Sequence, residues 1–114
     1  MLRRFNYCRT MTAPELPHPE MSDVALTDVL FALSDPTRLE LARQLVHGPM
    51  DMAACGATGG PVPKATKSHQ LKVLREAGVV RNVPKGRGRL LSLRREELDA
   101  AFPGLLDSVL GARA

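Results

Sequence analysis

Apolar residues recur at helical spacing from Ser22 onward, and the first run of them predicts a helix. Serine is a residue type that caps helix N-termini, so we expect this helix to begin at Ser22 and to end near Leu33. Its apolar positions are Val24, Val29, Leu30 and Leu33.

The segment SDPTRLELARQLVHGP predicts a second helix with both a start and a stop signal. Asp35 stands at the cap position and Pro36 at the first helical position, where its fixed φ and missing N–H suit a helix start. Gly48 and Pro49 end the segment. The apolar positions between these signals are Leu39, Ala42, Leu45 and Val46.

A third helix is predicted between Lys64 and Ala77, a stretch that contains neither glycine nor proline. Lys67, Leu71 and Leu74 fall at i, i+4 and i+7 and therefore share one face of it. Gly78 ends the helix, because glycine readily takes the left-handed conformation that follows the last helical turn.

The segments on either side of this helix have different patterns. A short helix is expected at most just after Asp51, because three glycines and two prolines between residues 56 and 63 predict a loop. Alternating and β-branched residues flank PKGRGR in VVRNVPKGRGRLLSLR, which predicts a β-hairpin with a basic, glycine-rich turn. Pro103 divides the last apolar run into two short helices, and that run contains Leu98, Phe102, Leu105, Leu106, Val109 and Leu110.

This order of elements predicts an α+β, mainly helical domain over residues 22–110, a winged helix-turn-helix whose wing is a two-stranded β-hairpin. Residues 1–21 contain three prolines and mixed polarity, and they predict a flexible N-terminal arm in which Met11 and Met21 are alternative starts. Residues 111–114 are expected to form a C-terminal tail. Because 114 residues bury only a modest core, a second copy of the chain is a natural way to enlarge it.

The composition is that of a soluble globular domain, with 44% apolar residues. No uninterrupted apolar run is long enough to span a membrane. The arginine pair near the N-terminus is not followed by the apolar stretch of a secretory signal. We therefore expect a cytoplasmic protein without membrane contact.

Positive charge is concentrated in one third of the chain. Residues 62–95 hold ten lysines and arginines and one acidic residue, giving +9, whereas residues 22–61 and 96–114 each give −3 and residues 1–21 give +1. Such a run is often only a solvated face. However, a block this one-sided repels itself unless a polyanion neutralises it, which favours a nucleic-acid partner.

The face of the third helix opposite Lys67, Leu71 and Leu74 is small, polar and basic. A helix fits the major groove of B-DNA, where such side chains meet base edges and phosphates. Lys67 and Gln70 are also predicted DNA-binding residues. Lys67 either extends from the edge of the core or contacts a phosphate. We therefore predict groove contacts from Lys64, Thr66, Ser68, His69 and Lys72, and phosphate contacts from Lys85, Arg87 and Arg89 on the hairpin.

The chain resembles the ArsR-type winged helix-turn-helix repressors of bacteria. ALSDPTRLELARQL, residues 32–45, is similar to the second-helix signature of that family, SHQLKVLREAGVV, residues 68–80, to its recognition helix, and GRGRLLSL, residues 86–93, to its wing. The resemblance covers roughly residues 22–110. It implies a homodimer, joined through the first and last helices, that binds an imperfect palindromic operator in double-stranded DNA and releases it when an inducer is sensed.

Metal or thiol sensing would depend on few residues. Cys8 and Cys55 are the only cysteines, too few for a disulfide framework. A soft-metal site needs two or three thiolate ligands, and this requirement is met only if Cys8 reaches Cys55. The alternative is that Cys55 is a small, buried apolar residue without a ligand. The metal site on the last helix of the family is not expected either, since no histidine follows His69. We therefore predict no resident metal, and name Cys8 and Cys55 as a candidate thiol-sensing pair.

Catalysis and protein–protein interaction are the alternatives to DNA binding. Ser68 and His69 are nucleophile and base types, but adjacent helical residues point about 100° apart, so they cannot form a catalytic pair. We expect no enzymatic activity and no cofactor. The remaining alternative is a protein-interaction module whose basic winged-helix face binds an acidic partner. Salt-sensitive binding to DNA, but not to acidic protein, separates the two.

Overall fold

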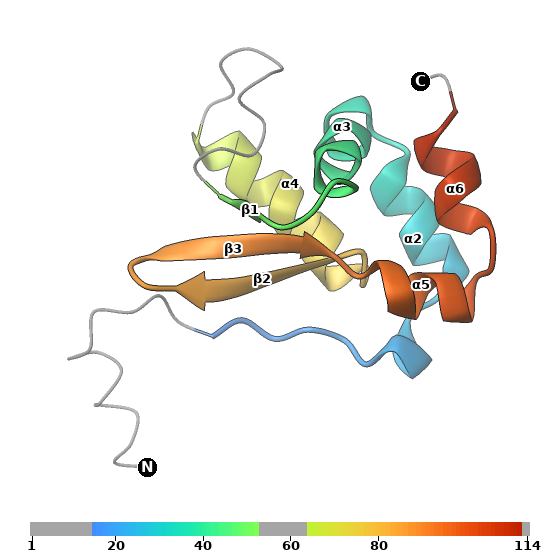
Figure 1. Cartoon of the computed structure of the whole chain (residues 1–114), viewed down its shortest axis with the longest axis horizontal. Helices are drawn as coiled ribbons and strands as arrows, with labels where there is room; N and C mark the ends of the chain where they lie inside the picture. The colour runs from blue at the N-terminus through green and yellow to red at the C-terminus, as the bar shows by residue number, and fades with distance from the viewer. Residues whose placement is uncertain (1–14, 53–63, 113–114) are drawn as a thin grey trace.

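The computed structural model describes residues 15–52 and 64–112, with only the backbone described at residues 64 and 65. In this part of the chain, helices surround one end of a small antiparallel sheet, and the sheet extends from them as a hairpin (Figure 1). The elements are a short 3-10 helix (Met21–Asp23), α2 (Leu26–Leu33), α3 (Pro36–Leu45), β1 (Met50–Asp51), α4 (Lys64–Glu76), β2 (Val80–Lys85), β3 (Gly88–Leu93), α5 (Arg95–Ala101) and α6 (Leu105–Leu110).

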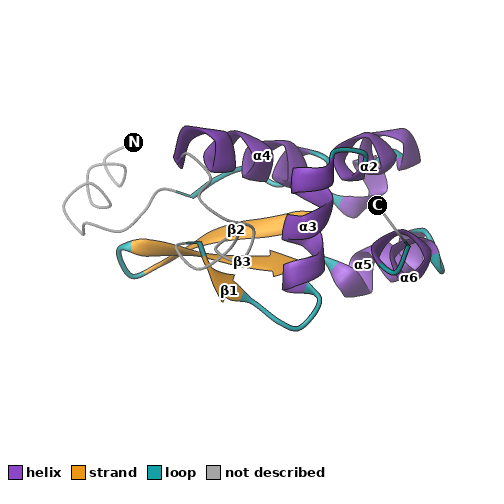
Figure 2. Cartoon of the chain, turned by 90° about the horizontal axis from the view of Figure 1, so that it is seen from above, coloured by secondary structure: helices purple, strands orange, loops and turns teal. Residues whose placement is uncertain are grey.

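The core lies where α2, α3 and α4 meet the base of the hairpin and the two last helices. In Figure 2, α4 and α2 lie along the top of the view and α3 crosses its middle, with the strands to the left of α3 and with α5 and α6 to its right. α5 and α6 lie at the end opposite the hairpin turn. The largest fully buried side chains are Val29, Leu71, Leu74, Val79, Val80, Leu91, Leu98 and Leu106.

The second predicted helix forms as expected. The carboxylate of Asp35 accepts hydrogen bonds from the backbone N–H groups of Thr37, at 2.9 Å, and Arg38, at 3.1 Å, which satisfies two of the donors left open at a helix start. Pro36 occupies the first helical position. The divided C-terminal helix is also confirmed, with α5 ending before Pro103 and α6 beginning after Gly104.

The first predicted helix begins later than the sequence indicated. Ser22 lies in the short 3-10 helix, Val24 is extended, and α2 starts only at Leu26. The prediction of Ser22 as a cap was therefore wrong. The extended conformation lets Val24 pack against the core beside Gly78, a tertiary contact that outweighs local capping preference. Leu30, one of the apolar positions of this helix, is 43% exposed.

The sheet has three strands, not the two of the predicted hairpin. β1 pairs with the outer edge of β3, where Met50 lies opposite Leu91 and Asp51 opposite Leu90. A two-residue strand shows no alternation, so periodicity cannot reveal it. The hairpin itself is as predicted, and its two-residue turn consists of Gly86, with φ +59°, and Arg87.

Residues 15–20 form an extended N-terminal strap along the hairpin (Figure 1). The carbonyl oxygen of Pro17 accepts a hydrogen bond of 2.5 Å from Arg75, and that of Pro19 accepts one of 2.8 Å from Arg94. Between them, Nε2 of His18 accepts the backbone N–H of Asn82 at 3.0 Å. The part of the predicted flexible arm from residue 15 onward is therefore anchored to the domain, because buried arginines find their acceptors there.

Gly78 ends α4 as predicted, in a Schellman motif. Its N–H donates to the carbonyl of Arg75 at 3.1 Å and the N–H of Val79 donates to that of Leu74 at 2.9 Å. Gly78 has φ +89°, and a Cβ there would lie 2.5 Å from Cγ2 of Val24. Glycine is thus required both by the backbone and by the close approach of the segment before α2. None of the described helices combines the length and apolarity needed to cross a bilayer.

Candidate nucleic-acid interface

The two faces of α4 differ as the sequence predicted. Leu71 and Leu74 are buried, with exposures of 1% and 0%, and fix the helix to the core. The exposed side chains that the structure describes on α4 are Thr66, Ser68, His69, Lys72 and, in the last turn, Glu76. Small and polar side chains on the solvent side of a helix are what a major groove accepts.

Lys67 is half-buried and takes the first of its two predicted alternatives. Its Nζ donates a hydrogen bond of 2.9 Å to the carbonyl oxygen of Met52, the residue after β1. The aliphatic stem covers the edge of the core while the ammonium reaches a polar acceptor. In this arrangement Lys67 supports the start of α4.

Gln70, also half-buried, contacts Arg38. Its Oε1 accepts a hydrogen bond of 2.7 Å from Nη1 of Arg38, whose Nε donates to the carbonyl of Ala32 at 2.6 Å. Arg38 also lies over the ring of Phe31, 5.3 Å from its centroid. Sequence reasoning did not single out Arg38. A sequence signal for Arg38 did exist, because it is a cation in the first turn of a predicted helix. The helix dipole disfavours positive charge there, so a specific hydrogen-bonding partner is expected to stabilise it.

The hairpin presents its basic residues in two ways. Lys85 and Arg87 are exposed at the turn. Arg89 instead lies against its own strand pair, donating from Nε to the side-chain oxygen of Asn82 and from Nη2 to the Asn82 carbonyl at 3.2 Å. Burial lowers the pKa of Arg89, an effect that Arg75 adds to and Glu15 opposes. Arg89 therefore stabilises the hairpin. The outward-facing positive charge of the hairpin lies on Lys85 and Arg87 at the turn.

Not all of the predicted basic block faces outward. Arg75 and Arg94 are only 6% and 4% exposed. Arg94 and Arg81 both pair with Glu97 on α5, at 2.9 Å and 2.6 Å. The hydrogen bond from Arg94, followed by the charges of Arg94 and Arg81, lowers the pKa of Glu97 to about 2 against the desolvation that opposes it.

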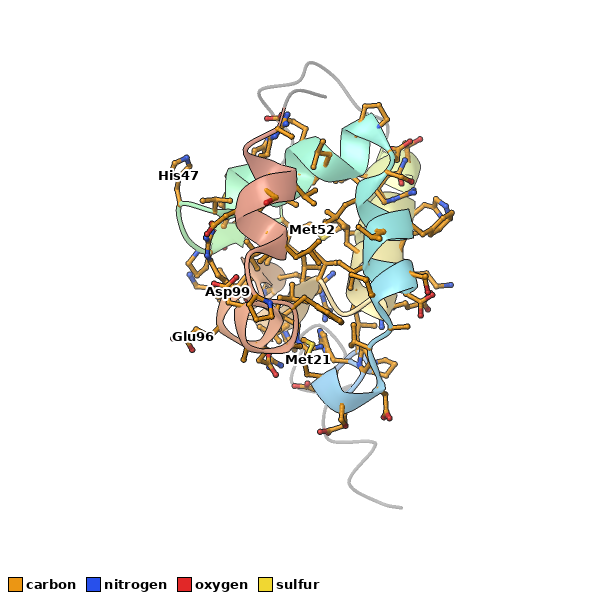
Figure 3. The ribbon with its side chains drawn as sticks, turned by 90° about the vertical axis from the view of Figure 1, so that its right-hand side faces the viewer. Met21, His47, Met52, Glu96 and Asp99 are labelled. Atoms are coloured by element: carbon orange, nitrogen blue, oxygen red, sulfur yellow. The ribbon has the colours of Figure 1, made fainter. Side chains whose placement is uncertain are left out.

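Acidic side chains gather at the end of the molecule away from the hairpin turn. Figure 3 shows Glu96 and Asp99 of α5 on that side. Arg95 pairs there with Asp99, at 3.4 Å, and with Asp107. In the described part of the chain, Lys72 on α4 and Lys85 and Arg87 at the hairpin turn carry exposed positive charge, whereas the exposed Arg81 is paired with Glu97.

Three predicted residues lie outside what the structure describes: Cys8, Cys55 and the side chain of Lys64. The thiol-sensing pair and the groove contact of Lys64 therefore stay predictions. Within residues 15–52 and 64–112, no group of three or more His, Cys, Asp or Glu side chains is placed to hold a metal ion.

Two known proteins are similar in sequence to most of this chain. The uncharacterized HTH-type transcriptional regulator YceK of Bacillus subtilis strain 168 is 30% identical over 92 residues, which cover 79% of this chain and 91% of that protein. The HTH-type transcriptional regulator NmtR of Mycobacterium tuberculosis strain H37Rv is 32% identical over 97 residues, covering 85% and 77%. No protein-family model matches the sequence.

Solved structures with the same fold carry related descriptions. A possible transcriptional regulator for arsenical resistance superposes with a TM-score of 0.59 at 33% identity, covering 71% of this chain and 82% of that one. The transcriptional repressor BigR from Xylella fastidiosa gives 0.58 at 27% identity, covering 77% and 88%. An ArsR family transcriptional regulator gives 0.60 at 23% identity, covering 77% and 98%, and supports the fold alone.

The exposed polar face of α4, the basic hairpin turn and these similarities agree with one another. A helix with a polar outer face beside a basic wing is the arrangement by which winged helix-turn-helix proteins bind DNA. The chain belongs to the ArsR family of HTH-type transcriptional regulators and is a DNA-binding regulator of transcription.

Proposed function

We propose that this protein is a dimeric, non-enzymatic, cytoplasmic repressor that occupies promoter DNA and is released by an inducing signal. The exposed face of α4 enters the major groove, where His69 and Ser68 meet base edges and Thr66 and Lys72 lie at its margins. The observation that carries this proposal is the division of α4 into a buried apolar face and an exposed polar face. BigR, described as a transcriptional repressor, supports the repressor assignment.

The wing adds contacts that are independent of sequence. Lys85 and Arg87 stand at the exposed end of the hairpin, so they reach phosphates beside the groove that α4 occupies. Arg89 contributes indirectly, because its hydrogen bonds to Asn82 hold the two strands in register near the turn.

The dimer joins the molecules at the end opposite the hairpin turn. Leu26, Leu30 and Phe31 of α2 are 43%, 43% and 64% exposed, an apolar surface on a helix next to the core. Leu105 and Val109 of α6 are only partly buried. A symmetric pair that covers these residues places two α4 helices on one side, which matches an imperfect palindrome of two half-sites.

The salt dependence of DNA binding tests the proposal. With three or four exposed cations per protomer, a dimer neutralises roughly 6 to 8 phosphates, and the slope of log affinity against log salt concentration should be about −5 to −7. The measurement is a fluorescence anisotropy titration at several salt concentrations, with DNA from upstream of its own gene and with random duplex. Polyglutamate serves as the acidic-protein control.

The outcomes separate the two functions that the sequence allows. Steep salt dependence with duplex DNA and weak binding of polyglutamate support a DNA-binding regulator. A flat response with DNA, or equal binding of polyglutamate, would instead favour the protein-interaction module. Sedimentation equilibrium of the free protein tests the dimer, and a monomer at the concentrations that bind DNA would contradict that part of the proposal.

A further inference from the structure

Arg38, the third residue of α3, holds the C-terminal end of α2. Its Nε donates a hydrogen bond of 2.6 Å to the carbonyl of Ala32, and its Nη2 donates one of 3.3 Å to the carbonyl of Phe31. The last four carbonyls of a helix have no partner within that helix, so they need acceptor contacts from elsewhere. Arg38 therefore caps α2, although it belongs to the next helix.

The third nitrogen of the same guanidinium holds α4. Nη1 donates a hydrogen bond of 2.7 Å to Oε1 of Gln70. A guanidinium is planar and presents its donors in a fixed fork, so the three nitrogens cannot move independently. Arg38 is only 8% exposed, which gives water little access to replace these bonds. The position of Gln70 is therefore linked to that of the carbonyls that end α2.

Gln70 lies where it can fix the rotation of α4 about its axis. It directly follows His69 and comes one helical turn after Thr66, both of which are exposed on the proposed groove face. Leu71 and Leu74 hold α4 against the core, but apolar contacts are non-directional. A hydrogen bond depends on distance and angle. The bond from Arg38 therefore adds a directional restraint to the part of α4 that carries His69.

Phe31 connects Arg38 to the surface proposed for the dimer. The guanidinium lies over the Phe31 ring, 5.3 Å from its centroid, and Phe31 is 64% exposed. A contact between a cation and an aromatic ring becomes stronger when it is removed from water. A second copy of the chain that covers Phe31 therefore holds Arg38 more firmly, and Gln70 with it.

We propose that Arg38 is a positioning residue for DNA recognition, which couples the dimer contact at Phe31 to the orientation of α4 through Gln70. This inference rests on the proposed function, because it assumes that Phe31 lies in the dimer and that α4 lies on DNA. Such a coupling is reciprocal. Formation of the dimer contact raises the affinity for DNA, and DNA binding stabilises the dimer by the same factor.

A double-mutant cycle between Phe31 and Gln70 tests the coupling while Arg38 stays intact. Phe31→Ala, Gln70→Ala and the double variant are titrated by fluorescence anisotropy with duplex DNA from upstream of the protein's own gene. Protein concentrations are chosen at which sedimentation shows each variant to be dimeric and circular dichroism shows it to be folded. The salt concentration is raised until DNA binding falls in that range.

The effect of Phe31→Ala should depend on the presence of Gln70. It should weaken DNA binding by the dimer about 5- to 20-fold in the wild type, but about twofold or less in the Gln70→Ala background. Arg38→Lys keeps the charge and replaces the planar fork by one ammonium group, so in that background the two substitutions should become additive. Equal fold-changes with and without Gln70 in otherwise wild-type protein would overturn the inference.

Leu26→Ala is the matched control for Phe31→Ala. Leu26 is also an exposed apolar residue of α2, at 43%, but it begins the helix and lies five residues before Phe31. Its substitution should change DNA binding by the same factor with and without Gln70. If the Leu26 effect also disappears in Gln70→Ala, the coupling belongs to the dimer contact in general, which contradicts a specific role of Arg38.

Amide hydrogen exchange gives a readout that requires no DNA. The amides of α4 around Gln70 should exchange more slowly above the concentration at which the dimer dissociates than below it. This difference should be lost in Gln70→Ala. A purely structural role of the Arg38–Gln70 bond instead gives these amides the same protection in monomer and dimer, and that result would contradict the coupling.

The failures of the two proposals are distinguishable. A monomeric wild type, or one that binds duplex DNA without salt dependence, would overturn the proposed function in its dimer or its DNA-binding part, and this inference with it. A dimeric wild type with salt-dependent DNA binding, together with an additive cycle, would overturn only this inference, whatever the exchange experiment shows.

Discussion

Nη1 of Arg38 on α3 donates a hydrogen bond of 2.7 Å to Oε1 of Gln70 on α4. The same guanidinium donates to the carbonyl of Ala32 at 2.6 Å and to that of Phe31 at 3.3 Å, at the C-terminal end of α2. One side chain, 8% exposed, therefore joins the proposed dimerisation helix to the proposed recognition helix.

Replacing Arg38 should destabilise the fold more than replacing its partner. Arg38→Met keeps much of the apolar stem but leaves the Ala32 carbonyl without this donor, and should lower the free energy of unfolding by about 2 to 4 kcal/mol. Gln70→Ala should cost about 1 to 2 kcal/mol, because two hydrogen bonds of Arg38 remain. Urea denaturation of both single variants and the double variant measures these values. Strictly additive effects would contradict a direct coupling.

Base recognition and phosphate binding should be separable between α4 and the hairpin. His69→Ala should lose about 1 to 3 kcal/mol of discrimination at one base position, because His69 is exposed on the groove face. Arg87→Ala should weaken operator and random DNA alike and make the salt slope shallower by about one per protomer. Affinities for a set of single-base operator variants test the difference. Identical behaviour of the two variants would mean that the recognition face is misplaced.

Acid should destabilise the protein partly through Glu97. Its pKa in the folded protein is about 2, below its ordinary 4.5, so folding favours the ionised form. The unfolded chain binds the proton first, and the stabilisation present above pH 4.5 is lost as the pH falls toward 2. Glu97→Gln should show a smaller loss of stability over this window.

The control for Glu97 is Glu96→Gln, on the exposed side of the same helix (Figure 3). It should keep the acid dependence of the wild type when unfolding is followed by circular dichroism between about pH 5 and pH 2. If Glu97→Gln and the wild type lose stability in parallel, the pair with Arg94 does not set the acid response.

Gly78→Ala should be strongly destabilising. A left-handed conformation costs a residue with a Cβ roughly 1 to 2 kcal/mol, and the clash with Val24 adds to it, for a total of about 2 to 4 kcal/mol. Gly88→Ala is the matched control, since its Cβ would meet only the Lys85 carbonyl, at an ordinary 3.8 Å. Thermal unfolding of both variants measures the contrast. Equal effects would show that neither the φ of Gly78 nor its contact with Val24 matters to stability.

Local interactions explain the parts of this protein that the sequence predicted well. Asp35 and Pro36 act within one turn of α3, Gly78 acts within the last turn of α4, and the turn of the hairpin needs glycine at Gly86. Each signal is complete in a few consecutive residues. The same holds for the two faces of α4, because helical periodicity alone separates Leu71 and Leu74 from Ser68 and His69.

Only the tertiary structure decided which charges face outward. Arg75, Arg89 and Arg94 belong to the same basic block as Lys85 and Arg87, and composition gives no reason to divide them. Folding does so, because it brings an acceptor to each arginine of the first group. Pro17 and Pro19 reach Arg75 and Arg94 from the distant strap, Asn82 reaches Arg89 from the neighbouring strand, and Glu97 reaches Arg94 from the first turn of α5.

The sequence by itself determined the order of the helices and the hairpin, since hydrophobic period and turn chemistry are local properties of the chain. The tertiary structure decided the third strand, the late start of α2, the course of the strap and the link between Arg38 and Gln70. Those features join residues up to 75 positions apart, as Pro19 and Arg94 are, and no local pattern encodes the free energy of a contact between segments that meet only after folding.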